Sequence, residues 1–240
     1  ALRHSLEAFH GKQDAGALDA AWPHLDHEDR FVRYAARLAI EHQPVSSWQQ
    51  RVLLENDPQR RLYGVIALAR HGSKDLRDDA YQALLSIEEA QLSAGEKLDL
   101  MRAFGLVMIR LGEPDGTIRD AMIETLNSNY PGTEAALNRE RGRLLAVLDA
   151  PGIVGKMLSE LAVYGSVETD DGLISDSVIV RSEQYGPTLS EMRANMPRPQ
   201  EIDIVMSLRV VQSGWTLSQR EVYFQWFYDA LRKSGGESYV

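Results

Sequence analysis

The chain has 240 residues, 44% of them hydrophobic and 25% charged, which is the composition of a folded globular protein and excludes an intrinsically disordered one. Its formal net charge of -9 disfavours a nucleic-acid partner, because phosphate binding requires clustered positive charge. The absence of cysteine excludes disulfides, thiolate nucleophiles, cysteine-ligated zinc and covalent haem attachment within these residues, and no apolar run approaches the roughly 20 residues that span a bilayer.

The first part of the sequence predicts short amphipathic helices separated by Gly, Pro and polar residues. Asp29 is expected to cap one helix, and Ser46 or Ser47 to cap the short helix that follows. A break at Asn56-Asp57-Pro58 then precedes a further helix. The expected helical ranges are 2–9, 15–25, 30–42, 48–53, 59–70 and 74–87.

The later part of the sequence predicts longer helices. Ser93 and Glu96 fit the Ser-x-x-Glu capping box, and Thr216 is placed to cap the last helix. The expected ranges are 93–111, 118–126, 135–148, 153–164, 175–184, 189–195, 199–211 and 217–231.

An internal match at an offset of about thirty residues indicates a repeat protein. The matched residues are Val32, Ala35, Ala36 and Ala39 in the first copy and Leu62, Val65, Ile66 and Ala69 in the second. Helix pairs that cannot bury their own apolar faces must stack on their neighbours. We therefore expect an all-α fold, an α-solenoid of about five helix pairs over residues 1–165. Residues 166–240 are expected to form an atypical helical cap in the same continuous domain.

Four arginines fall on successive second helices of the predicted pairs and form a candidate ladder: Arg33, Arg61, Arg102 and Arg139. We favour a structural interpretation, in which each pairs with an acidic residue of an adjacent turn, such as Asp29, Asp57, Asp99 or Glu140. The alternative is a ladder that binds a ligand on the inner surface.

The C-terminal segment carries a dense aromatic group, which comprises Trp215, Tyr223, Phe224, Trp226, Phe227 and Tyr228. Most of this group is expected in the core, because large aromatic side chains gain most from burial. So many rings cannot all face inward, however, and Trp226 and Tyr228 are candidate contact anchors for a partner.

Two groups of polar residues have metal-ligand chemistry. A zinc site is conceivable at His24, Asp26, His27, Glu28 and Asp29, and a calcium site at Glu168, Asp170, Asp171 and Asp176. The first group straddles a turn where capping residues are expected, and the second lacks the EF-hand spacing. No nucleophile elbow occurs either, so we assign no catalytic, cofactor-binding or metal-binding residue.

Residues 29–39 resemble the second helix of a HEAT-type repeat. Asp29 supplies the acidic residue that opens the turn, Val32-Arg33 follows, and Ala35-Ala36 forms the closely packed pair. The resemblance is looser at residues 58–72 and only periodic beyond.

A second resemblance is scattered over nearly the whole chain. It rests on Trp22-Pro23, Asp29-Arg30, Leu137-Asn138-Arg139-Glu140, Gly214-Trp215-Thr216, the run from Tyr223 to Trp226 and the closing Gly235-Gly236-Glu237-Ser238-Tyr239. These stretches resemble the helical segment that precedes the C-terminal haem domain in large exported c-type cytochromes of planctomycete-like bacteria. The resemblance implies a periplasmic or cell-surface fragment of a multidomain protein, with the redox chemistry in neighbouring domains. The haem-attachment motif Cys-x-x-Cys-His is absent here, so no haem role is carried over.

These patterns predict a noncatalytic scaffold, spacer or protein-interaction module, whose partner is a protein or a neighbouring domain of the same polypeptide. The alternative from another class is an enzyme resembling the HEAT-like DNA glycosylases, which requires a continuous basic groove that includes the arginine ladder. A third hypothesis is carbohydrate binding by the C-terminal aromatic residues.

Overall fold

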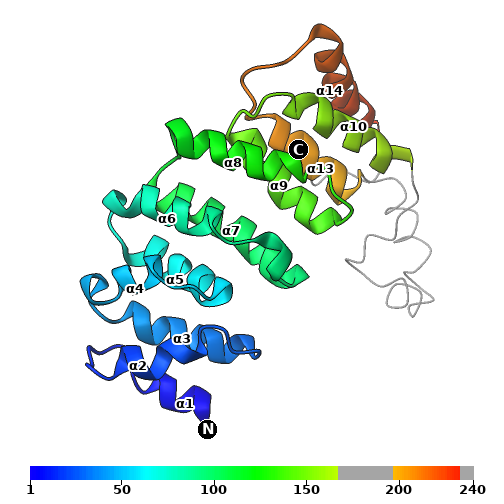
Figure 1. The fold of residues 1–240 in the computed structure, drawn as a ribbon. Helices are drawn as coiled ribbons and strands as arrows, with labels where there is room; N and C mark the ends of the chain where they lie inside the picture. The colour runs from blue at the N-terminus through cyan, green and yellow to red at the C-terminus, as the bar shows by residue number, and fades with distance from the viewer. Residues whose placement is uncertain (167–196, 233–240) are drawn as a thin grey trace, which may run out of the picture. The chain divides into compact units, whose positions relative to one another are not determined.

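The computed structural model describes residues 1–166 and 197–232, which are helical with no strand among them (Figure 1). The expected all-α fold is therefore confirmed for this part of the chain. None of the described helices is long and apolar enough to cross a membrane. The helices expected at 175–184 and 189–195, and the acidic residues from Glu168 to Asp176, lie outside the described residues.

The chain divides by its packing into two compact units, Ala1–Ser128 and Asn129–Val240, and each is described by itself. The division expected between repeats at 1–165 and a cap at 166–240 stays a prediction, since residues 167–196 are not described. The α-helices of the first unit are α1 (Leu2–Glu7), α2 (Ala17–Ala21), α3 (Arg30–Glu41), α4 (Gln49–Leu53), α5 (Pro58–His71), α6 (Arg77–Leu85), α7 (Ala94–Leu111) and α8 (Gly116–Ser128). Short 3-10 turns lie at Trp22–His24, Val45–Ser47, Lys74–Leu76 and Glu89–Gln91.

In the first unit the longer helices α3, α5 and α7 pack in sequence, each against the next. The helices between them form a second row, in which α4 contacts α5 and α6, and α6 contacts α7 and α8 (Figure 1). The apolar residues expected to form the seam are buried at Val32, Ala35, Ala36 and Ala39 in α3 and at Leu62, Val65 and Ala69 in α5. Ile66 differs, because it is only half-buried and faces a groove.

Side-chain caps fix where the principal helices begin. Asp29 accepts a hydrogen bond from the backbone N–H of Phe31 at 2.8 Å, and Asp57 accepts one from the backbone N–H of Arg60 at 2.8 Å. A capping box with Ser93 at the cap position opens α7, as the sequence predicts. Each cap satisfies a backbone donor that the first helical turn leaves without a partner.

The predicted cap of the short helix α4 is wrong. Ser46 and Ser47 lie in the 3-10 turn before it, and the Ser47 hydroxyl donates to the carbonyl of Pro44 at 2.7 Å. Trp48 occupies the cap position without a side-chain hydrogen bond. The serine therefore stabilises the preceding turn, a competition that is typical of short hydroxyl side chains near helix ends.

The second unit has four described helices, namely α9 (Ala135–Val147), α10 (Ile153–Ser166), α13 (Pro199–Leu208) and α14 (Leu217–Ala230). Helices α9 and α10 contact each other and α13, and α14 packs on α10. Thr216 caps α14 in a capping box with Gln219, which confirms the predicted cap.

The expectation that most C-terminal aromatic residues lie in the core is wrong for α14, because none of its residues is buried. Large apolar side chains lie on more than one side of α14, and the described helices cover only one of these sides.

Gly64 in α5 permits the close approach of α4. A Cβ atom at this position would lie 2.9 Å from Cγ2 of Val52, which is fully buried and stiff at its branched Cβ. We expect Gly64→Ala to lower the free energy of unfolding by about 1 kcal/mol, because the steric cost exceeds the helix-propensity gain. Urea denaturation measures the change.

The matched control is Gly95→Ala in α7, where an added Cβ meets nothing within 4 Å. This change should be neutral or stabilising by up to about 1 kcal/mol. In a Val52→Ala background, Gly64→Ala should cost nothing. An equal loss of stability in both backgrounds would show that contact with Val52 is not the cause.

Candidate functional site

The first unit carries a groove of about 820 Å³ along α3, α5 and α7. Its charged lining is balanced, with the basic residues Arg30, Arg33, Arg37 and Arg102 and the acidic residues Asp26, Glu28, Glu96 and Asp99. Two of the four predicted ladder arginines, Arg33 and Arg102, therefore lie in one groove.

Arg33 is held by backbone carbonyls. Its Nη1 donates to the carbonyl of His27 at 2.7 Å and to that of Glu28 at 3.0 Å, both in the turn before α3. Its guanidinium also lies 5.1 Å from the centre of the Tyr63 ring, within the range of a cation–π contact. These contacts connect the start of α3 to α5.

Tyr63 continues the connection to α7. Its hydroxyl donates to Oδ2 of Asp99 at 2.7 Å, and Arg102 lies 3.8 Å from the other oxygen of the same carboxylate. Burial, together with the acceptor Asp99, raises the pKa of Tyr63 to about 12, while Arg33 acts in the opposite direction. Arg33, Tyr63, Asp99 and Arg102 thus form a polar chain across the adjacent helices α3, α5 and α7.

The predicted pairing with an acidic residue is correct for Arg102 with Asp99 and wrong for Arg33 and Arg61, while Arg139 pairs with a different carboxylate, that of Asp203. Arg33 and Arg61 bind backbone carbonyls instead, because Asp29 and Asp57 are occupied as helix caps.

Arg61 and Arg139 lie apart from the groove residues. The Nε of Arg61 donates to the carbonyl of Glu55 at 2.6 Å, and its Nη1 donates to Ser86. In the second unit, Arg139 pairs with Asp203 on α13 at 3.4 Å rather than with its neighbour in sequence. Arg61 and Arg139 are thus each engaged by groups of their own unit.

Helix α3 exposes two aromatic side chains beside arginines that line the groove. Phe31 is 53% exposed and Tyr34 is 54% exposed, both on α3. The guanidinium of Arg30 lies 4.8 Å from the centre of the Phe31 ring, and that of Arg37 lies 5.3 Å from the centre of the Tyr34 ring. Exposed aromatic residues next to arginines are typical of residues that contribute most to protein interfaces.

A buried carboxylate links α3 and α5 beyond the groove. Glu41 is 6% exposed and lies 3.0 Å from Arg37, 3.1 Å from Arg70 and 3.2 Å from His71. The sequence places His71 near a helix end but does not reveal this cluster, because the carboxylate comes from a helix thirty residues earlier.

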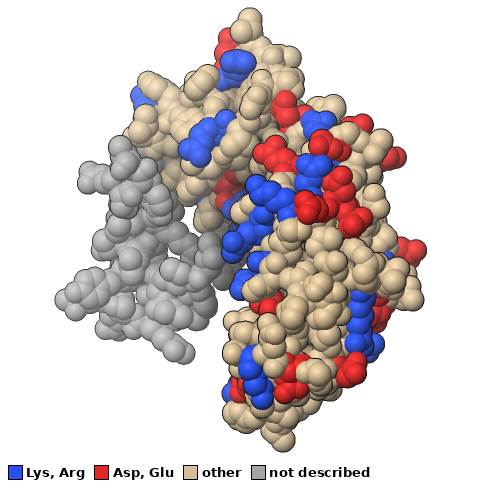
Figure 2. All heavy atoms as spheres, turned by 90° about the vertical axis from the view of Figure 1, so that its left-hand side faces the viewer, with Lys and Arg blue, Asp and Glu red and all other residues tan. Residues whose placement is uncertain are grey.

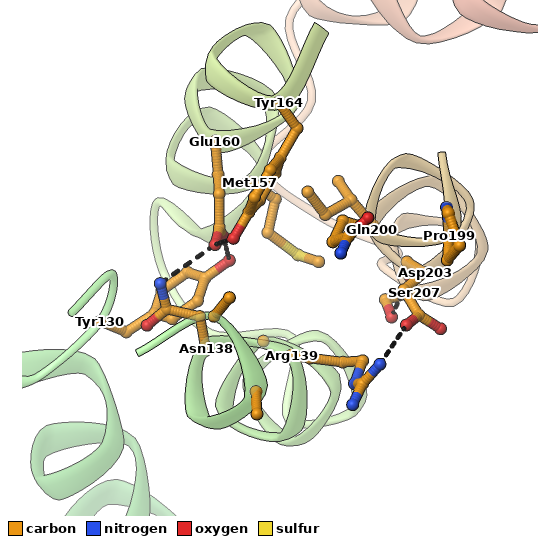
Figure 3. Close-up of a pocket in the computed structure, with 14 residues that line it drawn as sticks. Tyr130, Asn138, Arg139, Met157, Glu160, Tyr164, Pro199, Gln200, Asp203 and Ser207 are labelled. Carbon is orange, nitrogen blue, oxygen red and sulfur yellow. Dashed lines mark hydrogen bonds and ion pairs between the residues drawn. The ribbon is translucent and has the colours of Figure 1, made fainter. Parts of the chain in front are cut away.

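In the second unit, a pocket of about 230 Å³ lies among α9, α10 and α13 (Figure 3). Glu160 accepts hydrogen bonds from the hydroxyl of Tyr130 at 2.6 Å, from Nδ2 of Asn138 at 3.1 Å and from the hydroxyl of Tyr164 at 3.5 Å. Burial raises the pKa of Tyr130 far above its usual value. The three donors occupy the Glu160 carboxylate, so this network holds α9 and α10 together rather than presenting an unengaged base.

Trp226 and Tyr228 have different environments. The indole Nε1 of Trp226 donates to the buried carboxylate of Glu201 at 3.2 Å, so Trp226 is partly committed to packing against α13. Tyr228 is 56% exposed, and the guanidinium of Arg232 lies 5.0 Å from its ring centre. Of the two predicted anchors, Tyr228 is the more available to a partner.

Within residues 1–166 and 197–232, no group of three or more His, Asp or Glu side chains is arranged to hold a metal ion. The polar side chains after Pro23 bind other groups of the first unit instead. His27 Nδ1 accepts from the backbone N–H of Asp29 at 3.0 Å, and Asp26 pairs with Arg60 at 2.8 Å. The acidic loop considered for calcium lies outside the described residues.

No protein-family model matches the chain, and neither does any curated protein or solved structure. The function is therefore argued from the geometry of these surfaces.

The position of Tyr63 between Arg33 and Asp99 predicts opposite pKa shifts. We expect Asp99→Asn to lower the Tyr63 pKa from about 12 by roughly one unit, and Arg33→Gln to raise it. NMR titration of ring-labelled tyrosine measures both, with Tyr63→Phe to assign the signal. The pKa of Tyr63 is higher in the folded chain than in the unfolded chain. The protonated Tyr63 hydroxyl therefore stabilises the fold below about pH 10, and this stabilisation is lost as the pH rises towards 12. An unchanged titration in Asp99→Asn would contradict the polar chain.

The Glu160 network predicts a loss of stability when its acceptor is removed. Glu160→Ala leaves the buried donors of Tyr130 and Asn138 without their carboxylate, so the free energy of unfolding should fall by about 3 kcal/mol. The control Glu124→Ala, at an exposed position on α8, should change it by less than about 0.5 kcal/mol. Equal small effects in both variants would refute the structural role of Glu160.

Proposed function

We propose that the chain is a noncatalytic helical scaffold or interaction module that binds a protein, or a neighbouring domain of the same polypeptide, in the groove of its first unit. The observation that carries the proposal is the balanced charge of the groove beside the exposed rings of Phe31 and Tyr34. A surface of this composition suits a protein partner, since protein interfaces combine aromatic and arginine anchors with a polar rim.

The finer architecture that we propose for the first unit is a HEAT-like α-solenoid. The sequential packing of α3, α5 and α7, with a second row of shorter helices, supports it. So does the polar chain from Arg33 to Arg102, which joins α3 to α5 by a cation–π contact and α5 to α7 by a hydrogen bond. In a stacked-helix protein, such contacts keep successive repeats at a constant spacing and make the groove rigid before a partner binds.

Protein binding is better supported than the alternative of a DNA glycosylase-like enzyme. The four arginines of the groove lie among four carboxylates, so phosphate groups would meet no continuous positive surface there. On the face drawn in Figure 2, basic side chains likewise lie next to acidic ones. The chain as a whole is also acidic, with a net charge of -9.

The resemblance to the helical segment of exported cytochromes suggests a context for such a module. In that context the chain is a periplasmic or cell-surface spacer or docking domain that holds neighbouring domains of one polypeptide. The absence of cysteine from the chain places any covalently attached haem in those neighbours.

The proposal is tested by site-specific photocrosslinking in the source cells. A benzoylphenylalanine at Tyr34, on the groove rim, should yield a discrete adduct with a protein or a neighbouring domain, whereas one at the exposed Lys74 should not. The double variant Arg30→Glu with Tyr34→Ala should reduce binding of the identified partner at least tenfold without changing the unfolding midpoint, because both side chains lie at the rim.

Failure to crosslink from Tyr34, or unaltered partner binding by the double variant, would contradict the proposal. A mobility-shift assay with duplex DNA separates the alternative. Tight binding that weakens steeply with salt and depends on Arg33 and Arg102 would favour the DNA-binding enzyme instead.

A further inference from the structure

Helix α14 is apolar on two sides, and among the described residues its packing contacts lie on only one of them. On its inner side, the Tyr223 hydroxyl donates to the carbonyl of Val205 at 3.3 Å, and Trp226 bonds to Glu201. On its outer side, four large apolar residues remain exposed: Leu217 at 82%, Phe224 at 63%, Tyr228 at 56% and Leu231 at 76%. We call these four residues the outer stripe.

The outer stripe has the spacing of a helix–helix contact. Leu217, Phe224 and Leu231 recur every seven residues, and Tyr228 fills the position four residues after Phe224. Residues separated by three, four and seven positions lie on one face of an α-helix. Such a stripe is the pattern by which one helix packs along another.

Two charged residues of opposite sign flank the outer stripe. Glu221 precedes Phe224 by three residues, and Arg232 follows Tyr228 by four. Both are exposed, and neither forms an ion pair with another residue in the described part of the chain. Arg232 lies just after the end of α14, and its guanidinium lies 5.0 Å from the centre of the Tyr228 ring.

These positions are self-complementary about a two-fold axis near residue 226. When two copies of α14 lie antiparallel about that point, Phe224 of each copy faces Tyr228 of the other. Glu221 then comes opposite the end of the other helix, where Arg232 lies. A two-fold interface requires that residue i meets j while j meets i, and both the aromatic and the charged positions satisfy this condition. In this register Leu231 lies beside Glu221 of the other copy, and Leu217 extends past the end of the other α14.

We propose that the outer stripe of α14 binds the same stripe of a second copy of this chain, antiparallel, to form a two-fold dimer with two Glu221–Arg232 ion pairs. This surface is separate from the groove of the first unit, so the inference does not rest on the proposed function.

The size of the surface sets the expected strength of the dimer. The side chains that face each other are Phe224 and Tyr228, and aromatic side chains bury at most about 150–250 Å² each. The two copies therefore bury less than about 1,000 Å² in total, at the low end of protein interfaces. The dimer should therefore be reversible and depend on protein concentration. Sedimentation equilibrium over a wide concentration range is the appropriate measurement.

A charge-swap experiment tests the pairing. Glu221→Arg and Arg232→Glu should each weaken dimerisation at least fivefold, because each places like charges opposite one another. The double variant with both changes should recover to within about threefold of the original chain, since it restores opposite charges in reversed order. Asp229→Arg is the matched control, because it makes the same change of charge on α14 away from the stripe and should leave dimerisation unchanged.

The lack of cysteine in the chain allows the orientation to be tested directly. A mixture of Glu221→Cys and Arg232→Cys chains should form mainly the mixed disulfide on mild oxidation, whereas parallel helices would form the two symmetric disulfides. A chain that stays monomeric at every concentration overturns the proposal. So does a double variant that fails to recover, or a mixture that prefers the symmetric disulfides.

Discussion

The first unit depends on the close approach of α3 to α5. Arg33 of α3 lies 5.1 Å from the centre of the Tyr63 ring of α5, and Glu41 of α3 lies 3.1 Å from Arg70 of α5. The first contact lines the groove, and the second belongs to the buried cluster beyond it. Both polar features therefore depend on the packing of α3 against α5.

The features that the sequence predicts correctly are local. A cap such as Asp29 or a capping box such as Ser93 with Glu96 involves residues two or three positions apart, and hydrophobic periodicity is likewise read within one helix. These short-range patterns are sufficient to predict the all-α class and most helix positions. The serine predicted to cap α4 failed because a second local bond, to the carbonyl of Pro44, competes for the same hydroxyl.

The candidate sites were predicted less well, because their contacts join distant residues. Arg33 and Arg61 were expected to pair with aspartates that are already occupied as caps, so knowledge of the caps would have redirected the prediction. Tyr63 with Asp99, and Glu160 with its donors, lie on different helices and show no signal within one helix. The aromatic residues of α14 were expected in the core, and the number of helices able to cover them cannot be judged from composition.

The contacts of Glu41 affect how the packing of α3 against α5 responds to mechanical force. Its carboxylate faces Arg37 of its own helix and both Arg70 and His71 of the next, with side-chain exposure of only 2%. Any bending of α5 away from α3 must lengthen the contacts of the Glu41 carboxylate to Arg70 or His71. The buried carboxylate has no water within reach to replace these partners. The contact between α3 and α5 should therefore resist separation by force more strongly than a purely apolar contact of equal size, a property that suits the spacer role proposed above.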